Sequence, residues 1–353
     1  MKKREKIIIA VSIIVTAVAG ILNYLQLNVI LSFVVSAGAL ALLAKMVGDA
    51  TEQLGSRFGP AATGILQSAL GNLPEFFVAI FALKAGLNKV VQAALIGSIL
   101  GNSLLVLGLA IFLGGLKNGT QRFSSEPPKM MATLMILALA GLAIPTVTHI
   151  FHTPGSTHIN QMDIFLAIVL LIIFIASLFV SLKGDTALVS PPPESEAPHA
   201  VWPLAVTIIV LTVAGVAAGF VSDWFVNALK PAMQLLNIND TFAGLVIVAI
   251  AGNAIENVVG VQLAYKNQSD YAMSVIMNSS LQVALGLFPL LVLLSFFLGG
   301  SILSFVLAPM LLVSLALGVI VSAFIVFDGE SIWLEGLALI GLYLLIAAAF
   351  WWG

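Results

Sequence analysis

The chain has few charged residues and no cysteine, and both deficits limit what it can be. Of its 353 residues only 8% are charged, whereas soluble domains average about 25%, so no soluble globular domain fits. The lack of cysteine excludes disulfides and thiolate metal ligands. All four histidines (149, 152, 158 and 199) are predicted in loops. An intramembrane hydrolase would need a nucleophile–base pair or a metal held by histidine, so we do not expect an enzyme.

Apolar residues are what the chain has in excess. They make up 60% of the sequence, and the mean hydropathy is +1.13. The apolar runs last about 20 residues, which is typical of membrane helices and not of barrel strands. The first run shows no small-residue cleavage site, so we read residues 1–25 as a retained leading span. The sequence therefore predicts an all-α, multi-pass membrane protein of about eleven spans: 6–23, 28–57, 60–85, 88–115, 130–150, 161–182, 201–230, 238–265, 270–298, 301–325 and 331–352.

The placement of Lys and Arg predicts which side each loop faces. With the N-terminus in the cytoplasm, ten basic residues fall on the inner side and three on the outer side, which fits the positive-inside rule. We therefore expect a cytoplasmic N-terminus and an external C-terminus in the cell membrane of a prokaryote, since the tails are minimal. The inner residues are Lys2, Lys3, Arg4, Lys6, Arg57, Lys117, Arg122, Lys129, Lys183 and Lys266, and the outer residues are Lys84, Lys89 and Lys230.

Removing the leading span leaves two sets of five. An odd number of helices per repeat makes the second copy enter the membrane from the opposite side, so we predict two inverted repeats. Their expected bounds are 28–183 and 201–353, joined by a proline-rich linker over 184–200. Transporters built in this way carry their site near the midplane, where the repeats meet on broken helices.

Two matching pentapeptides mark that site. Gly71-Asn72-Leu73-Pro74-Glu75 and Gly252-Asn253-Ala254-Ile255-Glu256 lie 181 residues apart (256 − 75) inside apolar segments. A carboxylate in hydrocarbon is costly, so an intramembrane acid indicates function by default. Gly, Asn and Pro weaken the helix and free carbonyl oxygens. Glu75, Glu256, Asn72 and Asn253 are therefore the predicted metal ligands.

An all-oxygen pocket with two carboxylates suits a hard cation such as Ca²⁺. When the metal leaves, two neighbouring carboxylates in a low dielectric cannot both stay ionised, so they take up protons as a coupled pair. Ca²⁺ and protons then compete for Glu75 and Glu256, the predicted proton acceptors. That competition is what an antiporter with alternating access requires.

Other polar residues are weaker candidates. Ser98, Asn102, Ser279 and Gln282 could line the site or could join packed helices. Asp49, Glu52 and Asp223 lie toward the ends of long spans, where gating and interfacial roles are equally open. One of the paired glutamates could instead form a structural pair with Lys45. Asp163, Glu330 and Glu335 are expected to be solvated near span ends.

At these residues the chain resembles the cation/proton exchanger branch of the Ca²⁺/cation antiporter superfamily. The resemblance rests on Gly-Asn-x-x-Glu in both halves, on Ala82-Leu83-Lys84, and on the polar elements 97–102 and 278–282. It implies Glu75 and Glu256 as Ca²⁺ ligands and proton acceptors, and Glu52 and Asp223 as part of the transport path. It also implies that the long second and seventh spans slide to switch access. Three positions depart from the family pattern, namely Pro74, Asn257 and Asn278.

The expected function is exchange of Ca²⁺ for H⁺, with Ca²⁺ as the transported substrate and no organic cofactor. The expected partners are the two ions and the lipid bilayer, without nucleic acid, while oligomerisation cannot be inferred. Within the same class, Na⁺-driven exchange is the alternative, and the additional oxygen ligands it needs could come from the lining residues. A cation channel is the alternative from another class. A single inverted pair argues against it, because channels usually build rings from symmetric subunits.

Overall fold

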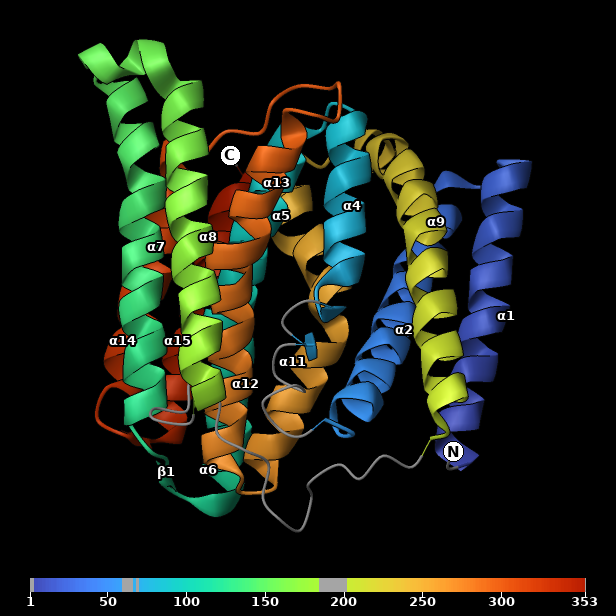
Figure 1. Cartoon of the computed structure of the whole chain (residues 1–353), viewed down its shortest axis with the longest axis horizontal. Coiled ribbons are helices and arrows are strands. Elements are labelled where there is room, and N and C mark those ends of the chain that lie inside the picture. The colour runs from blue at the N-terminus through green and yellow to red at the C-terminus, as the bar shows by residue number, and fades with distance from the viewer. Residues whose placement is uncertain (1–2, 59–65, 68–69, 184–201, 353) are drawn as a thin grey trace.

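The computed structural model describes residues 3–58, 66–67, 70–183 and 202–352, and gives only the backbone for 181–183 and 254–257. The predicted linker at 184–200 and the start of the expected third span lie outside the described residues. The molecule is a bundle of helices standing side by side (Figure 1). The helices are α1 (Lys3–Leu25), α2 (Val29–Gly55), α4 (Leu73–Lys84), α5 (Asn88–Leu100), α6 (Leu107–Asn118), α7 (Glu126–Ile150), α8 (Ile159–Lys183), α9 (Leu204–Leu236), α10 (Asp240–Phe242), α11 (Ala249–Tyr265), α12 (Ser269–Leu281), α13 (Phe288–Ser295), α14 (Pro309–Val326) and α15 (Trp333–Trp352), with π-helical η1 (Gly101–Val106), η3 (Ala243–Val248) and η4 (Gln282–Leu287), 3₁₀-helical η2 (Pro154–His158), and strands β1 (Gln121–Arg122) and β2 (Glu330–Ser331).

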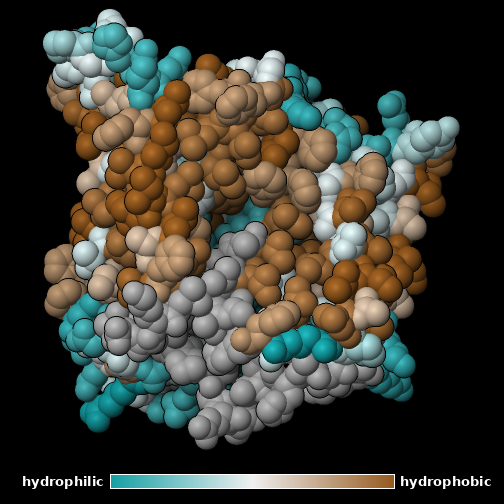
Figure 2. Space-filling model, viewed as in Figure 1, coloured by the Kyte–Doolittle hydropathy of each residue, from teal (hydrophilic) through white to brown (hydrophobic). Residues whose placement is uncertain are grey.

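The prediction of an all-α membrane protein is confirmed. Nine helical segments of the described chain are long and apolar enough to cross a membrane. A tenth candidate span is bent by 63° between 240–253 and 258–265. Figure 2 shows apolar residues across the middle of one face, with hydrophilic residues gathered along its upper and lower edges. That distribution matches an apolar belt between two wet interfaces.

Two predicted span limits are wrong. The span expected over 301–325 becomes helical only at Pro309, because the segment before it is extended and its backbone is bonded by neighbouring side chains. The span expected to end at Lys230 continues to Leu236. Pro231 lies inside this helix, which shows that the loss of one backbone donor did not end it.

Elements of the two halves recur at a constant spacing. Helices α5 and α12 begin 181 residues apart (269 − 88), the spacing of the two pentapeptides. The π-helical segments η1 and η4 that follow them keep the same spacing (282 − 101). Strands β1 and β2 form an antiparallel pair, which joins a loop of each half at one end of the bundle. The two halves therefore correspond in the positions of their α- and π-helical segments as well as in their sequence motifs.

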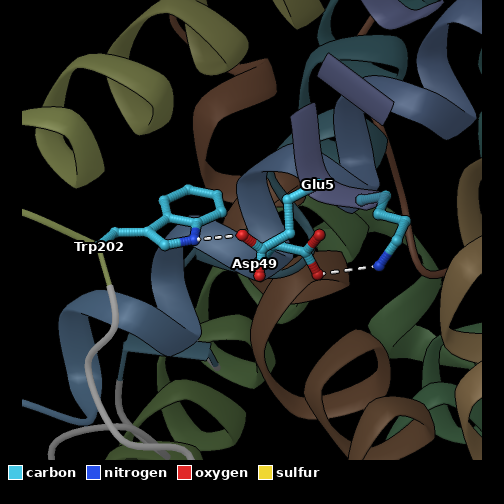
Figure 3. Close-up of polar contacts among 4 residues, drawn as sticks. Glu5, Asp49 and Trp202 are labelled. Atoms are coloured by element: carbon cyan, nitrogen blue, oxygen red, sulfur yellow. Dashed lines mark hydrogen bonds and ion pairs between the residues drawn. The ribbon is translucent and has the colours of Figure 1, made fainter. Parts of the chain in front are cut away.

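Helices α1, α2 and α9 meet at the end of the bundle where the chain begins (Figure 1). The indole Nε1 of Trp202 donates to Glu5 Oε2 at 3.0 Å, and its backbone N–H donates to Gln53 Oε1 at 3.1 Å. The Arg57 guanidinium donates to the Trp202 carbonyl. Figure 3 shows the Glu5–Trp202 bond beside the bond between Asp49 and the Lys45 ammonium. Trp202 thus joins the start of α1, the end of α2 and the approach to α9.

Candidate ion-binding site

Helix α4 begins inside the first pentapeptide. Asn72 is its N-cap residue, Pro74 occupies its first turn, and Glu75 follows in that turn. Proline is favoured at the start of a helix, where its missing N–H would have no partner. The positive end of the helix dipole also favours a carboxylate at this position. The structure therefore starts a helix at the first pentapeptide and places Glu75 at its N-terminus.

Glu75 meets two polar side chains at this point, one from each half of the chain. Its Oε1 accepts from Ser98 Oγ at 2.9 Å and from Asn253 Nδ2 at 2.6 Å. The Asn253 amide also lies 2.7 Å from Ser98 Oγ and 2.9 Å from the Ala249 carbonyl. Ser98 and Asn253 are 2% and 4% exposed, so these contacts are shielded from water and correspondingly strong.

Gly252 makes this approach possible. A Cβ atom built at Gly252 would lie 2.9 Å from Glu75 Cγ and 3.1 Å from its Oε1. Its backbone dihedral is not in the left-handed region, so space and not conformation requires the glycine. The Gly of the second pentapeptide was expected to weaken the helix. The structure shows that it admits the acid of the first.

The remaining predicted lining residues form two further bonds between the halves. Asn102 Nδ2 donates to Ser279 Oγ at 2.9 Å, and Asn72 Nδ2 lies 3.4 Å from Gln282 Oε1. All four side chains are buried. The predicted ligand Asn72 and the three lining residues are therefore brought together in pairs, each pair taking one residue from each half.

Local features that the sequence analysis missed bring the helices together here. A Cβ at Gly97 would lie 2.1 Å from the Leu245 carbonyl oxygen, and one at Gly244 would lie 2.3 Å from the Val90 carbonyl oxygen. Helix α5 and the π-helical segment η3 therefore touch backbone to backbone. The small residues within apolar runs were the available signal, since such residues permit close helix contact. π-Helical segments often occur at functional sites, but no residue pattern in the sequence predicted where they would form.

A narrow cavity borders Glu75 between α4, α5, α9 and α11. Its volume is about 30 Å³, which is room for one water molecule or one ion stripped of water. The face of the molecule drawn in Figure 2 has a hollow near its middle, with a hydrophilic patch at the base of the hollow. The cavity walls are otherwise apolar, and include Ala79, Ala82, Val91, Phe225 and Leu229.

Three predicted residues are not placed at this cluster by the described contacts. The side chain of Glu256 lies outside the description, although its backbone is in α11 one turn after Asn253. Glu52 is half-buried on α2. Asp223 accepts from Asn227 at 3.2 Å on α9. Their roles stay predictions.

The structure bears on two expectations about charged residues, while a pair of Lys45 with Glu256 lies outside the described side chains. Lys45 pairs with Asp49 at 2.9 Å, so the structure gives this lysine an aspartate partner on its own helix. Asp163 was expected to be solvated, and that prediction is wrong, because its side chain is 0% exposed. Asp163 lies at the start of α8, where the segment before α14 covers it. The predicted boundary of a span does not reveal such a cover.

Comparison with known proteins identifies the group to which the chain belongs. The sequence profile of the family described as sodium/calcium exchanger protein matches residues 28–183 and 206–352. The chain belongs to the sodium/calcium exchanger family. The resemblance drawn from the paired motifs is thereby confirmed, and this exchanger is a multi-pass membrane protein.

Individual relatives of this exchanger agree over nearly its whole length. It is 34% identical over 340 residues to the Ca(2+)/H(+) antiporter of Synechocystis sp., with 90% of each chain covered. It is 33% identical over 325 residues to the Ca(2+)/H(+) antiporter ChaA of Bacillus subtilis, covering 90% of this chain and 91% of that one. The solved structure of native YfkE matches with a TM-score of 0.82 at 30% identity, covering 98% of this chain and 99% of that one.

Proposed function

We propose that this protein exchanges Ca²⁺ for H⁺ across a membrane by alternating access, with Glu75 and Glu256 as the groups for which the two ions compete. The observation that carries the proposal is the contact of Glu75 with Asn253 and Ser98. It joins an acid of one half to the pentapeptide of the other. Relatives named as Ca(2+)/H(+) antiporters over about nine-tenths of the chain support the choice of ions.

The donors around Glu75 suit a site that changes occupant. Ser98 and Asn253 donate to its carboxylate, and both side chains also carry an oxygen that can accept or coordinate. Turning the Asn253 amide would present its oxygen instead of its nitrogen. The same groups can therefore hold a bare carboxylate or help to complete an oxygen shell around Ca²⁺, which accepts irregular geometry.

Protons are the natural competitor at this place. A carboxylate in a dry pocket is destabilised unless a cation or a proton neutralises it. If Glu256 approaches Glu75 from the bend in α11, repulsion between the two carboxylates adds to that cost. An empty, doubly charged site is then too costly to cross the membrane, and this couples the two ion flows.

We also infer that the two halves, 28–183 and 201–353, are inverted repeats joined by 184–200. The constant spacing of α5 with α12 and of η1 with η4 supports this, as do the two separate segments matched by the family profile. The chain starts at the lower end of the bundle in Figure 1 and its last helix ends toward the upper end. With the basic residues inside, the N-terminus is cytoplasmic and the C-terminus external.

Switching of access is assigned to α2 and α9. These long helices pack against each other, with Phe33 and Phe225 stacked at 5.0 Å between ring centroids. Helix α9 also rests on α4 through Gly215 and Gly219, which face Leu73 and Phe77. Small residues at such a contact leave a smooth surface, which suits sliding past the pentapeptide helices.

Ion-driven uptake tests the proposed exchange. The full chain is reconstituted into liposomes, and ⁴⁵Ca²⁺ uptake is driven by a pH gradient without sodium. We expect uptake that collapses with a protonophore and that Glu256→Gln abolishes, since Gln keeps the shape and removes the charge. Glu330→Gln is the matched control, because Glu330 is exposed and pairs with Arg122 at 3.3 Å.

A sodium gradient imposed without a pH gradient separates the alternative. If the sodium gradient alone drives Ca²⁺ uptake, the exchange is coupled to sodium and not to protons. Wild-type uptake by Glu256→Gln would instead remove the second carboxylate from the site and refute the paired-acid mechanism.

A further inference from the structure

Segment 296–308, which connects α13 to α14, crosses the end of the bundle opposite the chain's start; we call it the crossover segment (Figure 1, orange). Its first residues, 296–300, form turns and bends, and residues 301–308 then run without helix or strand, with the side chains of Leu303, Phe305 and Leu307 buried at 0%, 0% and 2% exposure. No neighbouring strand pairs with it in the described structure, so side chains of the surrounding helices bond its backbone instead.

Three alternate backbone N–H groups of the crossover segment each donate to one side chain. Leu303 N donates to Ser295 Oγ at 3.0 Å, and Leu307 N donates to Thr146 Oγ1 at 3.0 Å. Between them, Phe305 N donates to Asp163 Oδ1 at 3.4 Å. Two of the three acceptors are neutral hydroxyls, and the third is an acid.

Few hydrogen-bond donors reach the carboxyl group of Asp163, although it is fully buried. The backbone bond from Phe305 is 3.4 Å long, which makes it a weak one. The Ser304 hydroxyl interacts with the same carboxyl group, and Oδ2 makes no hydrogen bond. A full negative charge at 0% exposure with so few donors would be strongly unfavourable.

We propose that Asp163 is a proton-binding site separate from Glu75, which fastens the crossover segment when neutral and loosens it when ionised. Ionisation draws the carboxylate toward water and away from Phe305. The hydroxyls of Ser295 and Thr146 do not titrate, so the segment stays attached on either side and opens locally.

Among the described residues, Asp163 has no charged partner. Neither of the two ion pairs of the described residues includes it. Helix α13 and the crossover segment contain no charged residue. At the nearby ends of α4, α5, α7 and α8 the titratable groups are exposed: Lys84, Lys89, His149, His152 and His158.

Loosening of the crossover segment would affect the helices beside the ion site, because the segment contacts the ends of α4 and α5. This step rests on the proposed function. A Cβ at Gly300 would lie 3.0 Å from the Leu83 carbonyl oxygen at the end of α4. Asn88 and Gln92, in the first turns of α5, bond carbonyls of residues 301, 302, 304 and 306. The segment thus contacts the adjoining ends of α4 and α5, two of the helices that line the cavity at Glu75.

Hydrogen–deuterium exchange on the full-length protein in nanodiscs tests Asp163 without measuring transport. Protection of the amides of 303–307, corrected for intrinsic exchange, is compared between about pH 5 and pH 9. We expect protection in the wild type to fall by roughly tenfold as pH rises, the equivalent of one lost hydrogen bond. Asp163→Asn should keep high protection at every pH, because its amide oxygen still accepts from Phe305 without a charge.

Two further variants complete the test. Asp163→Leu removes the acceptor and should give low protection at every pH. Asp270→Asn is the matched control, since Asp270 also accepts one loop N–H, from Ser124 at 2.6 Å, but is exposed; it should leave the wild-type profile unchanged. A wild-type profile that is flat with pH, or an Asp163→Asn profile that falls as the wild type does, would overturn the proposal. Either result leaves the proposed Ca²⁺/H⁺ exchange at Glu75 intact.

Discussion

Glu75 and Asp163 are both acids within the helical bundle, yet their surroundings differ in kind. Glu75 stands at the start of a helix and receives bonds from Ser98 and Asn253, two side chains on different helices. Asp163 is fully buried and receives a long backbone bond from Phe305 and the hydroxyl of Ser304, both from one connecting segment. The first environment is built by side chains of separate helices, whereas the second is built by a single segment of the chain.

This difference indicates what each acid can bind. A cation such as Ca²⁺ needs six to eight oxygens, which only mobile side chains and loose carbonyls can supply. A proton needs one oxygen and a neutral pocket. Glu75 therefore suits a site shared by Ca²⁺ and protons, whereas Asp163 suits protons alone.

The largest expected effect comes from exchanging the acids for amides. Glu75→Gln should abolish Ca²⁺ exchange, because it removes the charge that attracts the ion, while Asp163→Asn should retain it. Uptake of ⁴⁵Ca²⁺ into liposomes, driven by a pH gradient, measures the exchange activity of both variants. Equal loss in the two variants would erase the distinction between the acids, and folding is checked by size-exclusion chromatography.

A smaller loss is expected when the space beside Glu75 is filled. Gly252→Ala places a Cβ 2.9 Å from Glu75 Cγ, so the acid or α11 must shift. Since misplacing a ligand by about 1 Å can cost on the order of a hundredfold, Ca²⁺ affinity should drop by tenfold or more. Isothermal titration gives the affinity. Gly48→Ala on α2, where no atom lies within 4 Å of the new Cβ, should bind like the wild type.

Removing one donor should cost less again. Ser98→Ala deletes the hydroxyl that bonds Glu75, which we expect to weaken Ca²⁺ binding by roughly tenfold, the equivalent of one bond to a charged group. Ser103→Ala on the same span is the comparison, because its hydroxyl bonds only the Ile99 carbonyl at 2.6 Å in the described structure. If both serine variants bind Ca²⁺ equally, the Ser98 contact has no part in the site.

The smallest effect concerns stability. A folded state that favours the neutral form of Asp163 gains stability at low pH and loses it as pH rises. Asp163→Asn escapes that loss, so its melting temperature should exceed that of the wild type increasingly toward alkaline pH. Thermal unfolding followed by tryptophan fluorescence detects the gap. A gap that stays constant with pH would contradict a titrating Asp163.

The sequence predicted well those features that follow from periodicity and cost. Apolar runs predicted the membrane helices, and the high cost of a buried carboxylate singled out Glu75, which the structure places beside Asn253 and Ser98. The pairing of Asn102 with Ser279 and of Asn72 with Gln282 is also consistent with the predicted lining of the site.

Features that depend on contacts between distant segments could not be predicted in the same way. Asp163 lies near the start of its helix, where the sequence suggests solvent, but a segment more than a hundred residues later covers it. The same segment reads as apolar and helical, yet bonds from Gln92 and Thr146 keep it extended. Gly252 was read as a local weakness of its helix because its actual neighbour, Glu75, belongs to the other half.

The Trp202 junction gives this protein an optical probe of its own. The Trp202 side chain belongs to a residue that is 3% exposed, whereas Trp333, Trp351 and Trp352 are exposed by 44%, 52% and 83%. Its indole reports on the meeting of α1, α2 and α9, two of which are the helices proposed to slide. Emission from Trp202, isolated by subtracting a Trp202→Phe spectrum, can therefore follow access switching in real time without any attached label.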